Sequence, residues 1–193
     1  MGADSITRRA PAVDKILSDI RVQLSSEFDR NFERQSFFSS AWERHRSPSR
    51  PGGHILLDKG NLRRSISARS DENSITFSSD LPYAEIHNKG GEIEVTAKMK
   101  RYFWHKYYEA VGAFGRKKNG EKRNDKRNAR LSEMAEFYKH MALMKVGSKV
   151  RIPKRTFLGT APELESKVTG IIQKNLEEYF NNNVDKILKK YDK

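Results

Sequence analysis

The chain has 193 residues, of which 36% are hydrophobic and 33% charged, with a formal net charge of +13 at pH 7 and no cysteine. The lack of cysteine excludes disulfides and thiolate zinc sites, and no apolar run approaches the ~18 residues of a membrane span. The positive charge favours an anionic partner, such as nucleic acid, a membrane surface or an acidic protein. Because the hydrophobic fraction is below the roughly 45–50% typical of globular chains, we expect a small core and segments that lie outside it or await a partner. The first residues lack the apolar stretch of a secretory signal, so we expect a soluble protein made in a cytoplasm.

A long amphipathic helix is predicted over residues 11–35. Apolar residues recur there at three- and four-residue spacing, and Pro11 suits a helix start. Polar residues, Asn31 among them, are assigned to the opposite face. The apolar stripe, which could pack on a sheet of the same chain or on a neighbouring subunit, consists of Val13, Ile16, Leu17, Ile20, Leu24, Phe28 and Phe32.

Three large aromatic residues follow this helix, namely Phe37, Phe38 and Trp42. We interpret them as apolar anchors that dock on a neighbouring subunit. Residues 48–53 then contain two prolines and two glycines, which excludes regular structure and predicts a basic loop.

Residues 56–96 are predicted to form a small antiparallel sheet. A turn with Gly60, which supplies a positive φ angle or a helix C-cap, leads into it. Residues 65–88 alternate apolar and polar side chains in three segments, and turn-forming residues at 70–74 and 79–82 separate them. This pattern is typical of a three-stranded meander. A further short strand follows a pair of glycines.

Residues 97–147 are predicted to be a helical, basic insertion, with one helix over about 97–111, capped by Thr96, and another over about 131–144. The segment between them, 112–130, carries eight basic and two acidic residues, a net charge of +6. Its composition predicts a solvated or disordered surface segment, and the alternative is an arm that contacts phosphates. Aromatic residues of the first helix could stack on bases but are typical of a core or an interface. The eight basic residues are Arg116, Lys117, Lys118, Lys122, Arg123, Lys126, Arg127 and Arg130.

The last helix is predicted over 161–180, after a short strand at 149–152. Thr160 and Glu163 have the spacing of a capping box, and Asn181–Asn183 are expected to interrupt the helix. The apolar residues expected to point inward are Leu164, Val168, Ile171, Ile172, Leu176 and Phe180.

No residue pattern predicts catalysis. The five histidines lack the spacing of metal ligands on a helix, and the sequence contains neither a nucleophile elbow nor a phosphate-binding loop. We therefore expect a protein that is not an enzyme, with no cofactor and no metal. A hydrolase that uses His87 is the alternative that the sequence favours least.

Three short blocks, in this order, resemble one protein family. They are "LLDKGNLRRSI" at 56–66, "YAEIHNKGG" at 83–91 and "IPKRTFLG" at 152–159. The chain is similar in these blocks, and over about residues 50 to 180, to the phage virion morphogenesis family. It departs from the family pattern at Lys59, where the family has threonine, and at Asn88, where it has glutamine.

This resemblance implies a structural virion protein, like the tail completion and head–tail joining proteins of Mu-like and P2-like phages. It implies a homo-oligomeric ring, with sixfold symmetry as the guess, at the head–tail junction of a virion made in the host cytoplasm. The implied partners are other neck, tail and connector proteins, and packaged DNA that passes through the channel; no membrane is implied. No catalytic residues carry over from the family.

The sequence therefore predicts a single α+β domain over residues 1–193, with a small antiparallel sheet packed against long N-terminal and C-terminal helices and a basic helical insertion. Three further candidate arginines lie outside the insertion: Arg63, Arg64 and Arg155. Each is predicted either to form an exposed salt bridge or to face DNA or a neighbouring subunit. The eight basic residues of 112–130 could likewise face DNA or a neighbouring subunit. The alternative function is a basic nucleic-acid-binding protein that uses 112–130.

Overall fold

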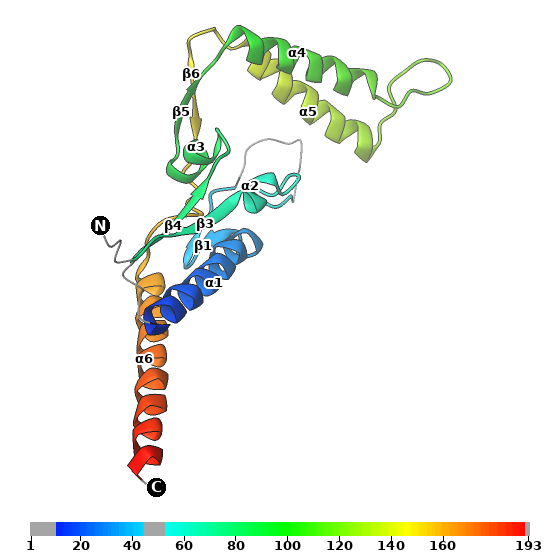
Figure 1. Ribbon diagram of the computed structural model, residues 1–193. Helices are drawn as coiled ribbons and strands as arrows, with labels where there is room; N and C mark the ends of the chain where they lie inside the picture. Colours follow the sequence, from blue (N-terminus) through cyan, green and yellow to red (C-terminus); the bar gives the residue numbers. More distant parts are fainter. Residues whose placement is uncertain (1–10, 45–52, 192–193) are drawn as a thin grey trace, which may run out of the picture. The chain divides into compact units, whose positions relative to one another are not determined.

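The computed structural model describes residues 11–44 and 53–191, and Figure 1 shows the order of its elements along the chain. Among these residues lie six helices and three two-stranded antiparallel sheets, which confirms the predicted α+β class. The loop predicted over 48–53 lies, except for its last residue, outside the described residues. Contacts group the chain into two compact units: unit one is Met1–Trp42, Leu56–Ala84 and Thr156–Lys193, and unit two is Glu43–Ile55 and Glu85–Arg155.

Two long helices carry the core of unit one, α1 (Pro11–Arg34) and α6 (Pro162–Tyr191). α1 forms as predicted, because apolar side chains three and four residues apart share one face of a helix. The assignment of Asn31 to the polar face is wrong: this side chain is fully buried, since it lies three residues after a core phenylalanine. The buried core cluster comprises Ile20, Leu24, Phe28, Phe37 and Ile171.

A β-hairpin covers part of this core. β3 (Ile66–Ser70) and β4 (Ile75–Ser79) pair in antiparallel register over their full length. The amide of Asp71 donates to the carbonyl oxygen of Ser74 at 2.9 Å, so the predicted hairpin turn is confirmed. The apolar side chains of β4 pack against the core cluster, as the alternating pattern requires of a half-buried strand.

Two further short elements belong to unit one. β1 (Ser36–Phe37) and β2 (Ser40–Ala41) form a minimal hairpin after α1. Later in the chain, α2 (Asn61–Arg64) is a single helical turn. Gly60 precedes α2 with a φ angle of 72°, in the left-handed region that glycine adopts at no steric cost. The positive φ predicted for Gly60 is confirmed, but the residue lies at a helix N-cap and not at a C-cap.

The third strand of the predicted meander is wrong, because its residues form a helix, α3 (Ala84–Lys89). An alternation over six residues is too short to separate a strand from helical turns. Glu85 and Lys89 form an ion pair of 2.8 Å at the four-residue spacing that places side chains on one side of a helix. Among the described strands, β3 and β4 accordingly pair only with each other.

Unit two contains a two-stranded ribbon in which β5 (Gly91–Glu94) pairs with β6 (Lys149–Ile152). Gly90, with a φ angle of 71°, links α3 to this ribbon. A Cβ atom at Gly90 would lie 2.7 Å from the backbone nitrogen of Lys154, which is closer than any real Cβ contact. Glycine is therefore required here both by the backbone angle and by the close approach of two chain segments.

A helical hairpin of α4 (Ala97–Gly112) and α5 (Lys126–Leu143) connects β5 to β6 (Figure 1). Thr96 caps α4 as predicted, and its hydroxyl accepts a hydrogen bond of 3.2 Å from the amide of Met99. α5 begins five residues earlier than predicted, and Leu143 at its C-terminal end is exposed. The buried apolar residues of the two helices are small, which permits close packing of their backbones: Ala110, Ala135 and Ala142.

α6 differs from its prediction at both ends. The carbonyl oxygen of Ala161 accepts the first amides of the helix, so Ala161 and not Thr160 holds the N-cap position. The carboxylate of Glu163, expected in a capping box, instead accepts a hydrogen bond of 2.9 Å from the hydroxyl of Ser39. The helix also continues through Asn181–Asn183 instead of ending there, which corrects the expected interruption.

Candidate functional site

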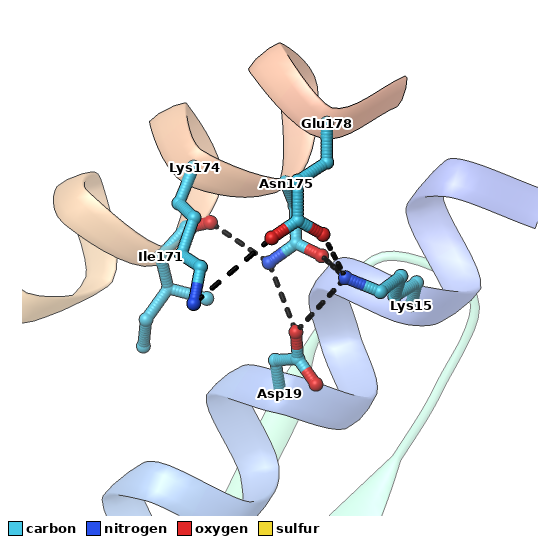
Figure 2. A network of polar contacts seen from close by, with 6 residues as sticks. All are labelled: Lys15, Asp19, Ile171, Lys174, Asn175 and Glu178. Atoms are coloured by element: carbon cyan, nitrogen blue, oxygen red, sulfur yellow. Dashed lines mark hydrogen bonds and ion pairs between the residues drawn. The ribbon is translucent and has the colours of Figure 1, made fainter. Parts of the chain in front are cut away.

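A polar network ties α1 to the middle of α6 (Figure 2). The side-chain nitrogen of Asn175 donates to Asp19 at 3.0 Å and to the carbonyl oxygen of Ile171 at 2.9 Å, and its oxygen accepts from Lys15 at 2.6 Å. Lys15 also pairs with Glu178 at 2.8 Å, which raises the pKa of Lys15 and lowers that of Glu178. Because a buried amide that loses its partners is costly, this network fixes the register of the two helices.

A buried carboxylate provides a second link between these helices. Glu27 is 5% exposed and pairs with Arg34 at 2.8 Å, with Arg30 at 3.1 Å and with Lys167 of α6 at 3.3 Å. Burial acts to raise the pKa of Glu27, but hydrogen bonds from Arg34 and Lys167 outweigh it and lower the pKa below its ordinary value. The ionised carboxylate therefore joins α1 to the first half of α6.

The second half of α6 exposes an apolar face. Leu176, Phe180 and Val184 follow one another at four-residue spacing and so share one side of the helix, with Tyr179 beside them. Their exposed fractions are 39%, 62%, 51% and 43% respectively. The prediction that Leu176 and Phe180 point inward is wrong, because α1 packs against the adjacent side of α6, which carries the network of Figure 2. We call these four residues the α6 apolar face.

The predicted interface anchors lie inside unit one. Trp42 is 7% exposed, its indole nitrogen donates to the carbonyl oxygen of Thr156 at 2.7 Å, and its ring lies 5.5 Å from that of Phe32. Phe37 belongs to the core cluster, and Phe38 is half-buried against it. In this structure the three aromatic side chains therefore stabilise their own unit.

Two neighbouring arginines of α2 have different surroundings. Arg63 donates to both carboxylate oxygens of Asp29 and pairs with Glu33 at 2.7 Å, and its hydrogen bond lowers the pKa of Asp29. Arg64 is exposed and donates to the carbonyl oxygen of Lys59 at 2.8 Å. Arg63 thus connects α2 to α1, whereas a role for Arg64 toward DNA or another subunit stays a prediction.

Arg155 and His87 lie together in unit two. Arg155 is 6% exposed, its Nε donates to the carbonyl oxygen of Glu43 at 2.9 Å, and its amide donates to the carbonyl oxygen of His87 at 2.8 Å. Burial lowers the pKa of His87, and the positive charge of Arg155 lowers it further. Arg155 is therefore placed inside the chain, and not on a surface that could face DNA.

The basic segment 112–130 was expected to be solvated or disordered; its basic side chains are exposed to solvent, and its backbone is held in a defined conformation around Asn128. Asn128 is 1% exposed; its side-chain nitrogen donates to the carbonyl oxygens of Gly115 at 2.8 Å and Arg123 at 2.7 Å, and its oxygen accepts from the amide of Gly115 at 2.8 Å. Its own amide donates to the N-cap residue Asp125 at 2.8 Å. We call these four hydrogen bonds the Asn128 clasp.

The eight basic residues of this segment fall into two groups. One group holds the loop through hydrogen bonds to carbonyl oxygens, an ion pair with Glu121 or a cation–π contact with Phe114, and comprises Arg116, Lys117, Lys122 and Arg123. The other group is exposed and has no ion-pair partner within the described part of the chain. We call it the tip cations, and it comprises Lys118, Lys126, Arg127 and Arg130.

A family model that describes the phage virion morphogenesis family matches residues 2–177. The chain belongs to this family. The resemblance read from the three sequence blocks is thereby confirmed, and this virion morphogenesis protein has a role in the assembly of a phage particle. No curated protein and no solved structure matches it significantly. Within residues 11–44 and 53–191, no helix is both long and apolar enough to cross a membrane.

Two of the three blocks of this virion morphogenesis protein meet in unit two. Gly90 of the second block approaches the backbone of Lys154 in the third, and the carbonyl oxygen of His87 accepts from the amide of Arg155. The adjacent residues form the β5–β6 ribbon. These two blocks therefore provide the backbone contacts at the base of the ribbon.

Sequence reasoning missed three buried polar residues of this virion morphogenesis protein: Glu27, Asn128 and Asn175. A signal was present for each. Glu27 lies three residues after the core residue Leu24, and Asn175 lies four after Ile171, so both fall on apolar helix faces. Asn128 stands three residues after an aspartate, at the spacing of a helix cap.

Proposed function

We propose that this virion morphogenesis protein is a structural component of the neck or tail end of the particle. It completes the tail or joins it to the DNA-filled head as one subunit of a ring, for which six copies are the expected number. Its partners are further copies of the chain and other neck, tail and connector proteins. Membership of the family supports this proposal, as do blocks that resemble those of tail completion proteins.

The α6 apolar face is the observation that carries the proposal. α6 has 30 residues and is therefore about 45 Å long, but α1 covers one side of it only in its first half and middle. Four large apolar side chains on the second half keep between 39% and 62% of their surface exposed. Burial of each would contribute roughly 1 kcal/mol or more, which is the kind of gain that drives subunit association.

The partner on this face is a second copy of the chain. In a ring every subunit makes the same contacts with its neighbours. The apolar face of each copy can therefore be covered by the neighbouring copy.

We also propose that the protein acts through these contacts and makes no chemical change. The shifted pKa values of its acidic groups support this: those of Glu27, Asp29 and Glu178 are lowered by ion pairs that hold helices together. Carboxylates whose pKa values are shifted by such structural ion pairs stabilise the fold, and their shifts do not indicate a catalytic site.

Deletion of the gene from the phage tests the proposal. We expect electron microscopy to show DNA-filled heads separate from unfinished tails, and expression of the protein from a plasmid to restore joined particles. Normal infectious particles from the deletion phage would contradict the proposal.

A matched pair of variants tests the α6 apolar face. Val184→Asp and Val22→Asp make the same substitution at exposed valines inside helices, 51% and 64% exposed. In the deletion phage we expect Val22→Asp to restore joined particles and Val184→Asp to leave heads and tails separate, although both purified proteins unfold at similar temperatures. Equal restoration by the two variants would exclude the face as a subunit contact.

A further inference from the structure

The positive charge of the chain is concentrated on one helical hairpin. Residues 97–143, from the start of α4 to the end of α5, carry thirteen lysines and arginines against five acidic residues, a net charge of +8 out of +13 for the whole chain. This hairpin is about a quarter of the sequence. Because such a concentration repels itself, it is typical of a surface that meets an anionic partner.

The acidic residues near the tip of the hairpin are already engaged. Glu121 pairs with Lys117 at 3.1 Å, and Asp125 accepts the amide of Asn128 as the N-cap of α5. Neither carboxylate neutralises a tip cation within the described residues. The tip therefore presents Lys118, Lys126, Arg127 and Arg130 to solvent as uncompensated charges.

The position of these cations is unfavourable in the free protein. Lys126 and Arg127 occupy the first turn of α5, at the positive end of the helix dipole, where the N-cap residue Asp125 supplies one negative charge and the first turn supplies none. Arg130 follows four residues after Lys126 on the same side of the helix, where like charges repel. An anion bound at the tip relieves both repulsions, because it places negative charge where the helix and its side chains are positive.

The Asn128 clasp holds this charged tip in a fixed conformation with neutral groups. The amide side chain of Asn128 binds the backbone at Gly115 and Arg123, so these three cross-links use no charged side chain. A preformed loop also loses less conformational entropy when it binds than a disordered one does.

The exposed side of α4 extends the basic surface along the hairpin. Lys98, Arg101 and His105 are exposed there, interleaved with Tyr102 and Tyr108, which are 54% and 65% exposed. Basic side chains contact phosphates and tyrosines offer polar, planar contacts to sugars and bases, so this composition suits a nucleic acid.

We propose that the tip of the α4–α5 hairpin binds the phosphate backbone of duplex DNA without reading its sequence. Duplex DNA is a dense polyanion, with about one negative charge per 1.7 Å of its axis, and phosphate contacts require charge but no base-specific geometry. The choice of DNA rests on the proposed place of the protein beside a DNA-filled head. The binding itself does not require ring formation, so it can be measured on the purified full chain.

Fluorescence anisotropy with a labelled 30-base-pair duplex, at a series of KCl concentrations, tests the proposal. Two triple variants each remove three positive charges from one lysine and two arginines. One changes the tip, Lys118→Gln with Arg127→Gln and Arg130→Gln, and the control changes exposed residues of unit one, Arg21→Gln with Lys59→Gln and Arg69→Gln.

We expect the tip variant to lose affinity and to reduce the slope of log K against log salt by about 2.7, at about 0.9 per phosphate contact. Over a fourfold rise in salt this corresponds to about a 40-fold smaller loss of affinity than in the natural protein. We expect the control variant to keep the natural slope. Equal losses in both variants would overturn the proposal, because they would show an effect of net charge alone.

Two other outcomes would also overturn it. One is the absence of duplex binding by the natural protein at 50 mM KCl. The other is competition by polyglutamate as effective as that by unlabelled duplex, which would assign the tip to an acidic protein surface. Neither outcome affects the Val184→Asp experiment, so a failure of DNA binding and a failure of assembly are separately visible.

Discussion

Replacement of Asn128 by alanine should release the tip of the α4–α5 hairpin. The substitution removes three side-chain hydrogen bonds of 2.7–2.8 Å, two to carbonyl oxygens and one from the amide of Gly115. At about 1 kcal/mol net for each bond, the closed loop loses about 3 kcal/mol. Alanine is the better helix former by roughly 0.5 kcal/mol, so a loss of about 2–3 kcal/mol is expected.

Hydrogen exchange measures this loss where it occurs. The amide of Gly115 bonds to Asn128, and the amide of Arg123 bonds to the carbonyl oxygen of Gly115 at 2.9 Å, so both exchange only when the loop opens. A loss of about 2–3 kcal/mol accelerates their exchange roughly 30- to 150-fold. The exposed neighbour Asn124, changed to alanine, is the control and should leave both rates nearly unchanged. Unchanged exchange in Asn128→Ala, or equal acceleration in both variants, would refute the role assigned to the clasp.

Two further predictions concern stability. Arg63→Gln should lower the free energy of unfolding by about 1 kcal/mol, because it breaks a partly buried bidentate ion pair, whereas Arg64→Gln should change it by less than about 0.5 kcal/mol. Urea unfolding of the two variants measures the difference, and equal losses would contradict it. The pKa of His87 is lower in the folded chain than in the unfolded chain. As the pH falls below about 6.5, His87 therefore takes up a proton more readily in the unfolded chain, and the free energy of unfolding decreases from pH 7.5 toward 5.5. Thermal unfolding should show a smaller decrease for His87→Gln than for the natural protein or for the exposed control His105→Gln; parallel decreases in all three would rule out the contribution of His87.

Long periodic segments of this chain could be predicted from the sequence, and short ones could not. α1 was predictable because its apolar residues keep helical spacing over 24 residues. The residues of α3 alternate as a strand does, but six residues are too few for the two periods to differ. The end of α6 was misjudged because a run of asparagines weakens helix propensity only slightly, and the side chain of Asn183 bonds back to the carbonyl oxygen of Tyr179 at 2.8 Å.

The candidate surfaces were harder to predict than the elements. Phe37 and Trp42 have the composition of interface anchors, but composition does not tell whether an aromatic residue meets its own core or another subunit, and both are buried in unit one. Order in the basic segment depends on Asn128, which lies 13 residues from the glycine that it binds. A contact of that kind leaves no periodic signal in the sequence. The family, in contrast, was recognisable from three short blocks and is confirmed.

Electron cryomicroscopy of intact virions tests the central claim most directly. Our account predicts density for this chain as a closed ring at the head–tail junction or tail end, with the second half of α6 against a neighbouring copy. Virions that are complete and infectious but lack the chain, or that contain it without a contact between copies along α6, would contradict the account.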